Sequence, residues 1–422
     1  MKTTALRLYG KNDLRLETFE LPPIQDDELL VRLVTDSICM SSYKAAVRGA
    51  DHKRVPDDVA ARPTVLGHEF CGEIVEVGAG LKGRYQPGQR FIVQTAMKGT
   101  YDAIGYSFQN MGGNMTYGII PSCVALGDYI IPYSGDAFFY GSLIEPLSCV
   151  VGAVHANYHT IQGEYRHIMD PVEGGAMAML AGAGPMGLAM IDYVLHRGRQ
   201  PKRLVVTDIN DERLERAARL LPVDRARQLG VELIYMNTSG SSDVVKDLLA
   251  LTGGNGFSDV FVFAPVSQVV EQADAILAYD GCLNFFAGPS DEQFSARYNF
   301  YDVHYNATHI TGTSGGNTSD MKEALDMASR ELLHPAILVT HVGGLDSAKD
   351  AILNLPGIAG GKKLIYNHIS LPLTAIEDFE EKGRDDALFA GLHRICAATG
   401  GLWNKEAEDY LLANAGPLPE VS

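Results

Sequence analysis

Short apolar runs alternate with glycine- and proline-rich turns over about the first 150 residues. The runs LLVRLVTDSICM, FCGEIVEVGAG and QPGQRFIVQTAM show strand-like alternation and little helical periodicity. This pattern predicts a compact, mostly β domain over residues 1–150.

The pattern changes near residue 148 to strand-like runs that alternate with helical segments. Runs such as MAMLAGAG, RLVVTD, DVFVFAP and GCLNFFAGP are separated by amphipathic stretches such as DERLERAARL. Strands that alternate with helices are typical of a parallel sheet. We therefore expect an α/β domain over residues 151–315.

The final segment, residues 367–422, predicts a separate helical extension. Thr374 and Glu377 fit a capping box, in which two side chains satisfy backbone donors at a helix start. Five residues then fall on one helical face: Leu388, Phe389, Leu392, Ile395 and Cys396. We expect a packed appendage here rather than a site.

Composition narrows the class of protein and of partner. The 422 residues carry 46% hydrophobic residues and a net charge of −17, which indicate a folded chain of two domains. The negative charge argues against nucleic acid or an anionic membrane as partner and mainly favours solubility, so we expect the partner to be a small-molecule substrate. The N-terminus lacks a signal-like apolar stretch, so we expect a cytoplasmic protein.

The six cysteines are scattered singly along the chain, without a C-x-x-C pair. This spacing excludes a disulfide framework and a self-contained four-cysteine zinc module. Ligands of any bound metal must therefore come from distant parts of the sequence. The cysteines are Cys39, Cys71, Cys123, Cys149, Cys282 and Cys396.

A dinucleotide fingerprint lies in AGAGPMG, between an apolar strand and an apolar helix. Gly182, Gly184 and Gly187 have G-x-G-x-x-G spacing, and Pro185 and Met186 stand between the last two. The glycines permit a tight turn, approach of the pyrophosphate to backbone N–H groups, and close packing of helix on strand. The segment predicts a Rossmann nucleotide-binding domain.

Cofactor choice depends on the residues after the next strand. Asp208 ends the run LVVTD, where an acid accepts hydrogen bonds from ribose hydroxyls and repels a 2′-phosphate, so it favours NAD. Arg213 packs on the adenine or, alternatively, accommodates NADP.

Candidate metal ligands are found in three separate motifs. His68 and Glu69 stand side by side in LGHEF, Cys39 ends the strand-like run DSIC, and Glu145 lies in IEPLSC. Thiolate, imidazole and carboxylate are zinc ligands, and a catalytic zinc keeps three protein ligands and one open position. Each residue also has a simpler interpretation, such as a core histidine or a helix-start acid.

With these motifs the chain resembles the zinc-dependent medium-chain dehydrogenase/reductases, and within them the sorbitol dehydrogenase branch. The likeness covers residues 5–365 and rests on ICMSS, GHE, PGQRF, IEPLSC, GAGPMG, VVTD and GKKLIY. It implies an α/β protein with a GroES-like, mostly β catalytic domain and a Rossmann domain with a doubly wound parallel sheet. Residues 316–366 would then return to the catalytic domain.

The resemblance also implies roles for single residues. Cys39, His68 and Glu69 fall on metal positions, with Glu145 the alternative or exchanging carboxylate of the catalytic site. Ser41 falls on the hydroxyl that relays the substrate proton. Asp208 and Arg213 fall on the NAD ribose and adenosine positions.

The chain departs from the family pattern in two places. Met40, Ser42 and Lys44 replace residues that are usual in the ligand loop, so the support of the metal ligands must differ. The segment TAMKGTYDAIGYSFQN has no cysteine where many relatives carry a structural zinc lobe. We therefore expect one zinc per subunit.

A cationic segment follows the ligand loop and bears on the substrate. KAAVRGADHKR carries Lys44, Arg48, His52, Lys53 and Arg54 with a single acid. Such a cluster binds anions, so a phosphorylated polyol or ketose is favoured over a neutral one, with Lys44 and Arg48 as candidate contacts. The alternative is an ordinary solvated loop.

Two rival functions remain open. A zinc-free quinone or enone reductase would share the architecture, and a nucleotide-binding redox sensor would bind NAD without turnover.

The run CLNFFAG bears on assembly. It would be an exposed apolar strand if it lay at a sheet edge, so we expect a homodimer or homotetramer that covers it.

Overall fold

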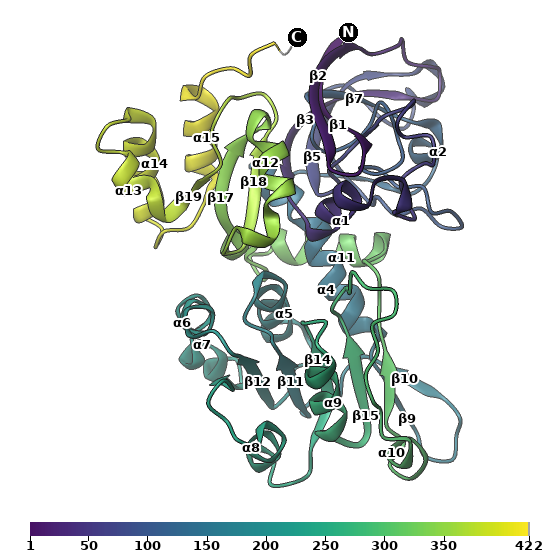
Figure 1. Ribbon diagram of the computed structural model, residues 1–422, viewed down its shortest axis with the longest axis vertical. Helices are drawn as coiled ribbons and strands as arrows, with labels where there is room; N and C mark the ends of the chain where they lie inside the picture. Colours follow the sequence, from purple (N-terminus) through teal and green to yellow (C-terminus); the bar gives the residue numbers. More distant parts are fainter. Residues whose placement is uncertain (421–422) are drawn as a thin grey trace. The chain divides into compact units, whose positions relative to one another are not determined.

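The computed structural model describes residues 1–420 and divides into two compact units (Figure 1). Unit 1 comprises Met1–Glu145 and Pro335–Ser422, and unit 2 comprises Pro146–His334. In Figure 1 the purple N-terminal strands and the green to yellow C-terminal segments both belong to unit 1. Unit 2 is therefore a continuous insertion into unit 1.

The unit boundaries differ from the expected ones at 150 and 315. Helix α11 (Thr318–Ser329) belongs to unit 2, because its Asp320 carboxylate accepts a hydrogen bond from His155 Nδ1 at 3.1 Å. His155 lies in α4 (Ile144–Ala156), whose residues from Pro146 onward are also in unit 2. The return to unit 1 thus begins at Pro335, later than the sequence indicated.

Unit 1 is built on a large sheet with the strand order β19-β17-β18-β3-β5-β6-β8, in which β7 also pairs with β3. A smaller sheet has the order β2-β1-β4. Strands β17 and β18, which follow unit 2 in sequence, therefore lie in one sheet with N-terminal strands. The bounds are β1 (Lys2–Gly10), β2 (Asp13–Glu20), β3 (Leu29–Ser37), β4 (Thr64–Val65), β5 (Phe70–Val77), β6 (Arg90–Val93), β7 (Tyr117–Ile120), β8 (Ile130–Pro132), β17 (Val339–Gly344), β18 (Lys362–Tyr366) and β19 (Thr374–Ala375).

Apolar side chains of these strands form the main core of unit 1. Val31, Leu33, Ile74 and Phe91 are almost fully buried in one cluster. Burial of several such side chains, at about 1.5–3 kcal/mol each, explains why the alternating runs form strands here. The mostly β domain predicted from the pattern is confirmed.

Five short helices lie in the N-terminal part of unit 1, before residue 143. They are α1 (Met40–Arg48), the 3-10 helix η1 (Gly49–Asp51), the 3-10 helix η2 (Ala79–Leu81), α2 (Ser122–Ala125) and α3 (Phe138–Ser142). Together, α3 and α4 form an apolar stretch, Phe138–Ala156, which is long and apolar enough to cross a membrane. However, 78% of its most apolar window is buried inside the protein, as in a core helix.

Unit 2 contains a parallel sheet with the order β13-β12-β11-β14-β15-β16 and a small β10-β9 hairpin. The order reverses direction at β11, the arrangement of a doubly wound nucleotide-binding sheet. The strands are β9 (Tyr158–Thr160), β10 (His167–Met169), β11 (Ala176–Leu180), β12 (Arg203–Asp208), β13 (Glu232–Asn237), β14 (Phe257–Val262), β15 (Leu277–Phe285) and β16 (His309–Thr311). The helices, besides α4 and α11, are α5 (Pro185–His196), α6 (Asp211–Leu220), α7 (Val223–Gln228), α8 (Val244–Leu251), α9 (Ser267–Ala275) and α10 (Phe300–Tyr305). The α/β domain predicted from the alternating pattern is confirmed.

The run CLNFFAG is not the edge of this sheet. It ends β15, which pairs with β14 on one side and with β16 on the other. The three-residue strand β16 is the edge instead. The sequence did not reveal this because β16 is too short to show a pattern.

Unit 1 continues after β17 with α12 (Ala348–Leu353) and ends in α13 (Phe379–Lys382), α14 (Ala387–Ala397) and α15 (Lys405–Asn414). The helical face predicted around α14 is confirmed, since Phe389, Leu392 and Ile395 are buried. The predicted capping box is wrong: Thr374 lies in β19, and its hydroxyl donates to the Pro372 carbonyl at 2.9 Å. The cap of α14 is Asp386, which accepts from the Leu388 N–H.

A buried glutamate of α15 holds the C-terminal helices to the rest of unit 1. The Glu408 carboxylate accepts hydrogen bonds from the backbone N–H groups of Phe138 and Phe139, at 2.6 and 2.9 Å, and from the Tyr366 hydroxyl at 2.9 Å. Trp403 Nε1 in turn donates to the Tyr366 hydroxyl at 2.8 Å. A side chain near the C-terminus thus caps α3, the helix that leads into Glu145 and α4.

We predict that Glu408→Ala lowers the free energy of unfolding of unit 1 by about 2–4 kcal/mol, because it leaves buried N–H and O–H donors without an acceptor. Glu406→Ala is the matched control, since Glu406 is exposed on the same helix. Chemical denaturation followed by Trp403 fluorescence measures both. Equal midpoints for the two variants would contradict the capping role.

Candidate functional site

Cys39 and His68 are brought together by the pairing of β3 with β5. Cys39 follows β3 and His68 precedes β5, and Asp36 pairs with Phe70 across the two strands. The Ser37 N–H donates to the Glu69 carbonyl at 2.8 Å, which extends the ladder to the ligand loop. The ligand atoms of Cys39, His68 and Glu69 lie within 4.8 Å of one another.

The His68 ring is oriented by three hydroxyl groups. Ser42 Oγ lies 3.4 Å from Nδ1, while Ser41 Oγ and Tyr106 Oη lie 3.1 and 3.3 Å from Nε2. Ser42 therefore supports the ring at the position where relatives usually have an aspartate. Burial lowers the pKa of His68, which favours the neutral imidazole that a metal requires.

Ser41 contacts both candidate ligands. Its hydroxyl donates to Cys39 Sγ at 3.0 Å and lies beside His68 Nε2. The hydroxyl expected to relay a proton thus lies beside the two side chains that would hold a metal.

Glu69 is held by a buried ion pair that the sequence did not predict. Lys362 Nζ lies 2.5 and 2.6 Å from the two carboxylate oxygens, and the Ser37 hydroxyl also donates to one of them. Burial alone would lower the pKa of Lys362, but the facing Glu69 carboxylate raises it overall. The Glu69 carboxylate is thus shared between this pair and the metal position.

Glu145 is the second carboxylate of the cluster and begins α4. Burial raises its pKa to about 7, while His68 lowers it and Glu69 and Cys39 raise it further. Burial likewise raises the pKa of the Cys39 thiol, and Glu69 adds to this effect. Thiol, imidazole and two carboxyl groups converge here, and together they suit a zinc ion.

Three further residues of the site, Asp36, Tyr106 and Lys362, could not be identified from the spacing of residues in the sequence. Asp36 Oδ1 accepts from the Glu69 N–H at 3.1 Å and Oδ2 from Asn114 at 3.0 Å, and burial raises the pKa of Asp36 well above its usual range. Gly67, at φ +99°, has no room for a side chain against Asn114. Tyr106 lies in the cysteine-free segment TAMKGTYDAIGYSFQN. In the sequence, Lys362 was noted only as part of the motif GKKLIY, without a role of its own.

The cationic segment, residues 44–54, lies on α1, on η1 and in the turn that follows. Lys44 and Arg48 lie on α1, and burial lowers the pKa of Lys44. His52 and Arg54 follow η1 and lie against the ring of Tyr106.

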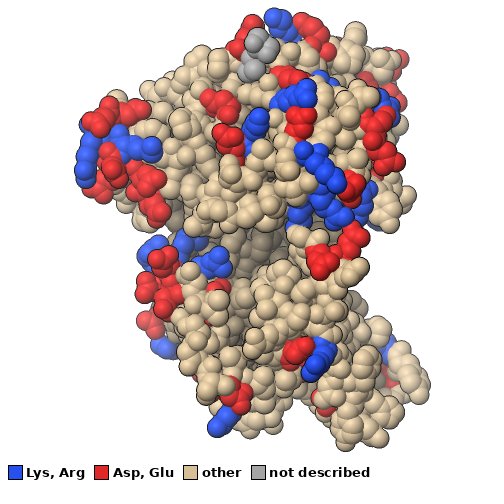
Figure 2. Space-filling model, viewed as in Figure 1, with Lys and Arg blue, Asp and Glu red and all other residues tan. Residues whose placement is uncertain are grey.

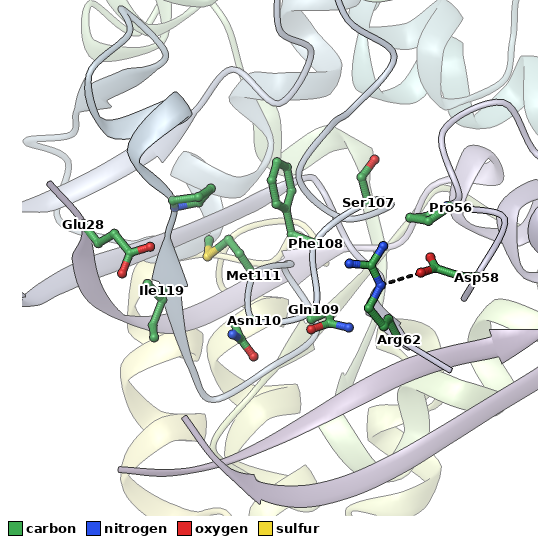
Figure 3. Close-up of a pocket in the computed structure, with 11 residues that line it drawn as sticks. Glu28, Pro56, Asp58, Arg62, Ser107, Phe108, Gln109, Asn110, Met111 and Ile119 are labelled. Atoms are coloured by element: carbon green, nitrogen blue, oxygen red, sulfur yellow. Dashed lines mark hydrogen bonds and ion pairs between the residues drawn. The ribbon is translucent and has the colours of Figure 1, made fainter. Parts of the chain in front are cut away.

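Unit 1 also has a pocket of about 290 Å³ that is separate from the metal cluster (Figure 3). Its one arginine, Arg62, is paired with Asp58 at 2.5 Å. None of the candidate metal ligands line it. The lining residues are Glu28, Pro56, Asp58, Arg62, Ser107, Phe108, Gln109, Asn110, Met111, Ile119 and Pro121.

The dinucleotide fingerprint folds in unit 2 as the glycine spacing predicts. Gly184 is the N-cap of α5, and Pro185 occupies its first turn, followed by Met186. A Cβ on Gly187 would lie 1.8 Å from the Gly182 carbonyl oxygen, so helix and strand pack closely only with glycine there. A Cβ on Gly184 would meet nothing within 4 Å, which leaves the helix start open to a pyrophosphate.

Asp208 lies at the end of β12, as predicted. Its Oδ1 accepts from the N–H groups of Ile209 and Asn210, at 2.9 and 3.2 Å, and its Oδ2 faces the Ala183 N–H at 3.3 Å. These bonds fix the carboxylate beside the glycine turn. Arg213 is exposed on α6, and its N–H is capped by Asn210 at 2.9 Å. The residues therefore fit a nicotinamide dinucleotide.

Comparison with protein families gives two matches. Residues 25–130 match the alcohol dehydrogenase GroES-like domain, and residues 185–330 match the zinc-binding dehydrogenase domain. The two matches fall in unit 1 and unit 2 respectively.

Relatives of known name match over nearly the whole chain, and two of them are similar to this protein at 49% identity. One is mannitol-1-phosphate 5-dehydrogenase of Aliivibrio fischeri, 49% identical over 97% of each chain. The other is L-sorbose 1-phosphate reductase of Klebsiella pneumoniae, 49% identical over 98% of each chain.

Among solved structures, one described as a zinc-binding dehydrogenase from Sinorhizobium meliloti 1021 bound to NADP has a TM-score of 0.70. It is 19% identical and covers 87% of this chain and 99% of its own. At that identity the likeness concerns the fold.

We predict different effects for alanine at two glycines of the fingerprint. Gly187→Ala should lower the stability of unit 2, because the new Cβ collides with the Gly182 carbonyl. Gly184→Ala should leave stability unchanged but weaken dinucleotide binding about 10-fold or more, because its Cβ projects into the open space at the helix start. Thermal unfolding and NADH fluorescence titration separate the two effects. Loss of stability in Gly184→Ala would contradict this assignment.

Proposed function

This chain belongs to the zinc-binding dehydrogenase family, and from that premise we propose that it interconverts a phosphorylated polyol and a phosphorylated ketose. Zinc and a nicotinamide dinucleotide are its cofactors. Mannitol-1-phosphate 5-dehydrogenase and L-sorbose 1-phosphate reductase, each 49% identical to this chain, are both oxidoreductases named for 1-phosphate substrates. The convergence of Cys39, His68 and Glu69, with Glu145 electrostatically coupled to all three, carries the proposal, because a zinc-free reductase or a redox sensor has no use for it.

Each residue of the cluster has a separate task in this proposal. Cys39 and His68 hold the metal, and Glu69 or Glu145 supplies the carboxylate ligand. A bound zinc supplies Lewis-acid chemistry, which polarises a ketone or lowers the pKa of an alcohol. In the reductive direction the substrate carbon gains a hydride from the reduced nicotinamide and its oxygen gains a proton.

Ser41 is the group placed to move that proton. Its Oγ contacts Cys39 Sγ and His68 Nε2, so it would lie next to the reacting oxygen of the substrate if those two residues held the zinc. Tyr106 Oη, 3.3 Å from the same nitrogen, adds a second hydroxyl. Both groups orient a substrate oxygen through hydrogen bonds.

Asp208 supports NAD as the preferred cofactor. A carboxylate at this position would repel a 2′-phosphate, and Arg213 alone would have to offset that repulsion for NADP to bind equally well.

We further infer a homodimer or homotetramer assembled through unit 2. Exposed aromatic side chains gather on α10, where Phe300, Tyr301 and Tyr305 are 77%, 66% and 61% exposed. Ile310, 47% exposed, lies on the edge strand β16. A second copy that pairs along this edge would cover both features. The cytoplasmic location stays a prediction.

We predict that the purified protein holds about one zinc per chain and that Cys39→Ala abolishes both zinc binding and turnover while NADH binding remains, because the dinucleotide residues lie in unit 2. Elemental analysis and steady-state NADH oxidation measure these properties. Cys123→Ala, at an exposed cysteine, is the control. Full activity of a metal-free Cys39→Ala enzyme would refute the zinc role.

The substrate class is tested in the same assay. We predict that kcat/KM is at least about 100-fold higher for L-sorbose 1-phosphate or D-fructose 6-phosphate than for L-sorbose or D-fructose, because an arginine–phosphate contact adds a charged hydrogen bond. Equal values would instead identify a dehydrogenase of neutral polyols.

For the assembly, we predict that Ile310→Lys shifts the protein towards monomers in sedimentation velocity, because it places a charge on the paired edge. Leu126→Lys, at an exposed leucine of unit 1, should leave the assembly unchanged. A wild-type monomer at micromolar concentration would overturn the inference.

A further inference from the structure

The cationic segment, residues 44–54, has an excess of positive charge next to the metal cluster. Its single acid, Asp51, is already paired with Lys11. Figure 2 shows blue Lys and Arg side chains gathered over the part of unit 1 that contains α1. The other charged side chains of the segment are cations, so the local field favours an anion.

Arg54 is fixed in place by its own backbone. Its N–H donates to His52 Nδ1 at 3.4 Å, and its carbonyl accepts from Ser107 Oγ at 2.7 Å. Its guanidinium carbon lies 5.3 Å from the centroid of the Tyr106 ring. Among residues 1–420, no carboxylate forms an ion pair with this guanidinium. A guanidinium over an aromatic ring keeps its N–H donors in its own plane, where they can bind an oxyanion.

Tyr106 connects this arginine to the metal cluster. Its ring centroid lies 5.0 Å from that of His68, and its hydroxyl lies 3.3 Å from His68 Nε2. Arg54 is therefore one aromatic ring away from a metal ligand. A sugar whose reacting carbon lies at the metal cluster could therefore present a phosphate several bonds away towards this side of the Tyr106 ring.

The pKa of His52 reflects the positive potential around the cationic segment. The His52 ring stacks on Tyr106, with centroids 5.5 Å apart and an interplanar angle of 8°. Burial, and after it the charges of Arg54, Arg48, Lys53 and Lys44, lower its pKa to about 4. Because Nδ1 accepts from the Arg54 N–H, the neutral ring carries its proton on Nε2, where it is a donor for an anion.

We propose that Arg54, held against Tyr106, binds the phosphate group of the substrate. His52 donates a second hydrogen bond, and Lys44 and Arg48 on α1 add to the attractive field. The inference rests on the proposed function and names the residue that reads the phosphate. It also assigns a role to the segment that replaces the structural zinc lobe, since that segment supplies Tyr106.

Arg54→Gln tests the proposal, with Arg62→Gln as the matched control, because Arg62 is a nearby arginine already neutralised by Asp58 (Figure 3). For Arg54→Gln, the ratio of kcat/KM for L-sorbose 1-phosphate over L-sorbose should fall about 10- to 100-fold, mainly through KM. The inhibition constant of inorganic phosphate should rise by a similar factor. Arg54→Lys should recover part of the loss, and Arg62→Gln should change neither quantity.

The outcomes separate this inference from the proposed function. If the wild-type enzyme shows no preference for the phosphorylated ketose, the proposed function fails. If the wild type has the preference and Arg54→Gln retains it, the phosphate site lies elsewhere and this inference fails. An equal loss for L-sorbose and its phosphate would show that Arg54 only supports the fold, which also overturns it.

Discussion

The buried ion pair between Lys362 and Glu69 is the contact on which the metal cluster depends. The two residues are 293 positions apart, with the whole of unit 2 between them, and both are almost fully buried. Breaking such a pair by removal of one partner costs about 3–5 kcal/mol, because the remaining charge loses its compensation. Lys362 lies in β18, which pairs with β3, so the pair also joins the returning chain to the strand that ends at the ligand loop. The second carboxylate, Glu145, begins the helix by which the chain leaves unit 1.

The surroundings of His68 show how a family site is kept when its usual supports are absent. Ser42 faces Nδ1 in place of an aspartate, and Asp36 instead orders the loop by accepting from the Glu69 N–H. The segment without the cysteine lobe is not a simple deletion. It turns at Gly105, at φ +83°, beneath the Gly67 carbonyl and presents Tyr106 to the histidine. This cysteine-free segment thus places an aromatic ring against His68.

Sequence reasoning found the parts of the molecule whose signals are local. The glycine spacing around Gly187 and the acid after β12 predicted the dinucleotide fold, because both follow from backbone geometry within one βαβ unit. The pairing of Cys39 with His68 came from residue type and family likeness. Lys362, Asp36 and Tyr106 were missed because their roles arise only from tertiary contacts. The edge strand β16 and the cap of α14 were missed for a related reason, since three-residue strands and single caps leave no periodic pattern.

The place of Glu408 near the end of the chain has a consequence for synthesis. Unit 2 is continuous in sequence, so it can fold on the ribosome once residue 334 has emerged. Unit 1 must wait for β18 and then for α15, whose Glu408 caps α3. Until then the N-terminal strands lack their β18 neighbour, and the helix that carries Glu145 lacks its anchor. Nascent chains can therefore acquire a folded unit 2 early, and unit 1 is completed only after residue 408 has emerged.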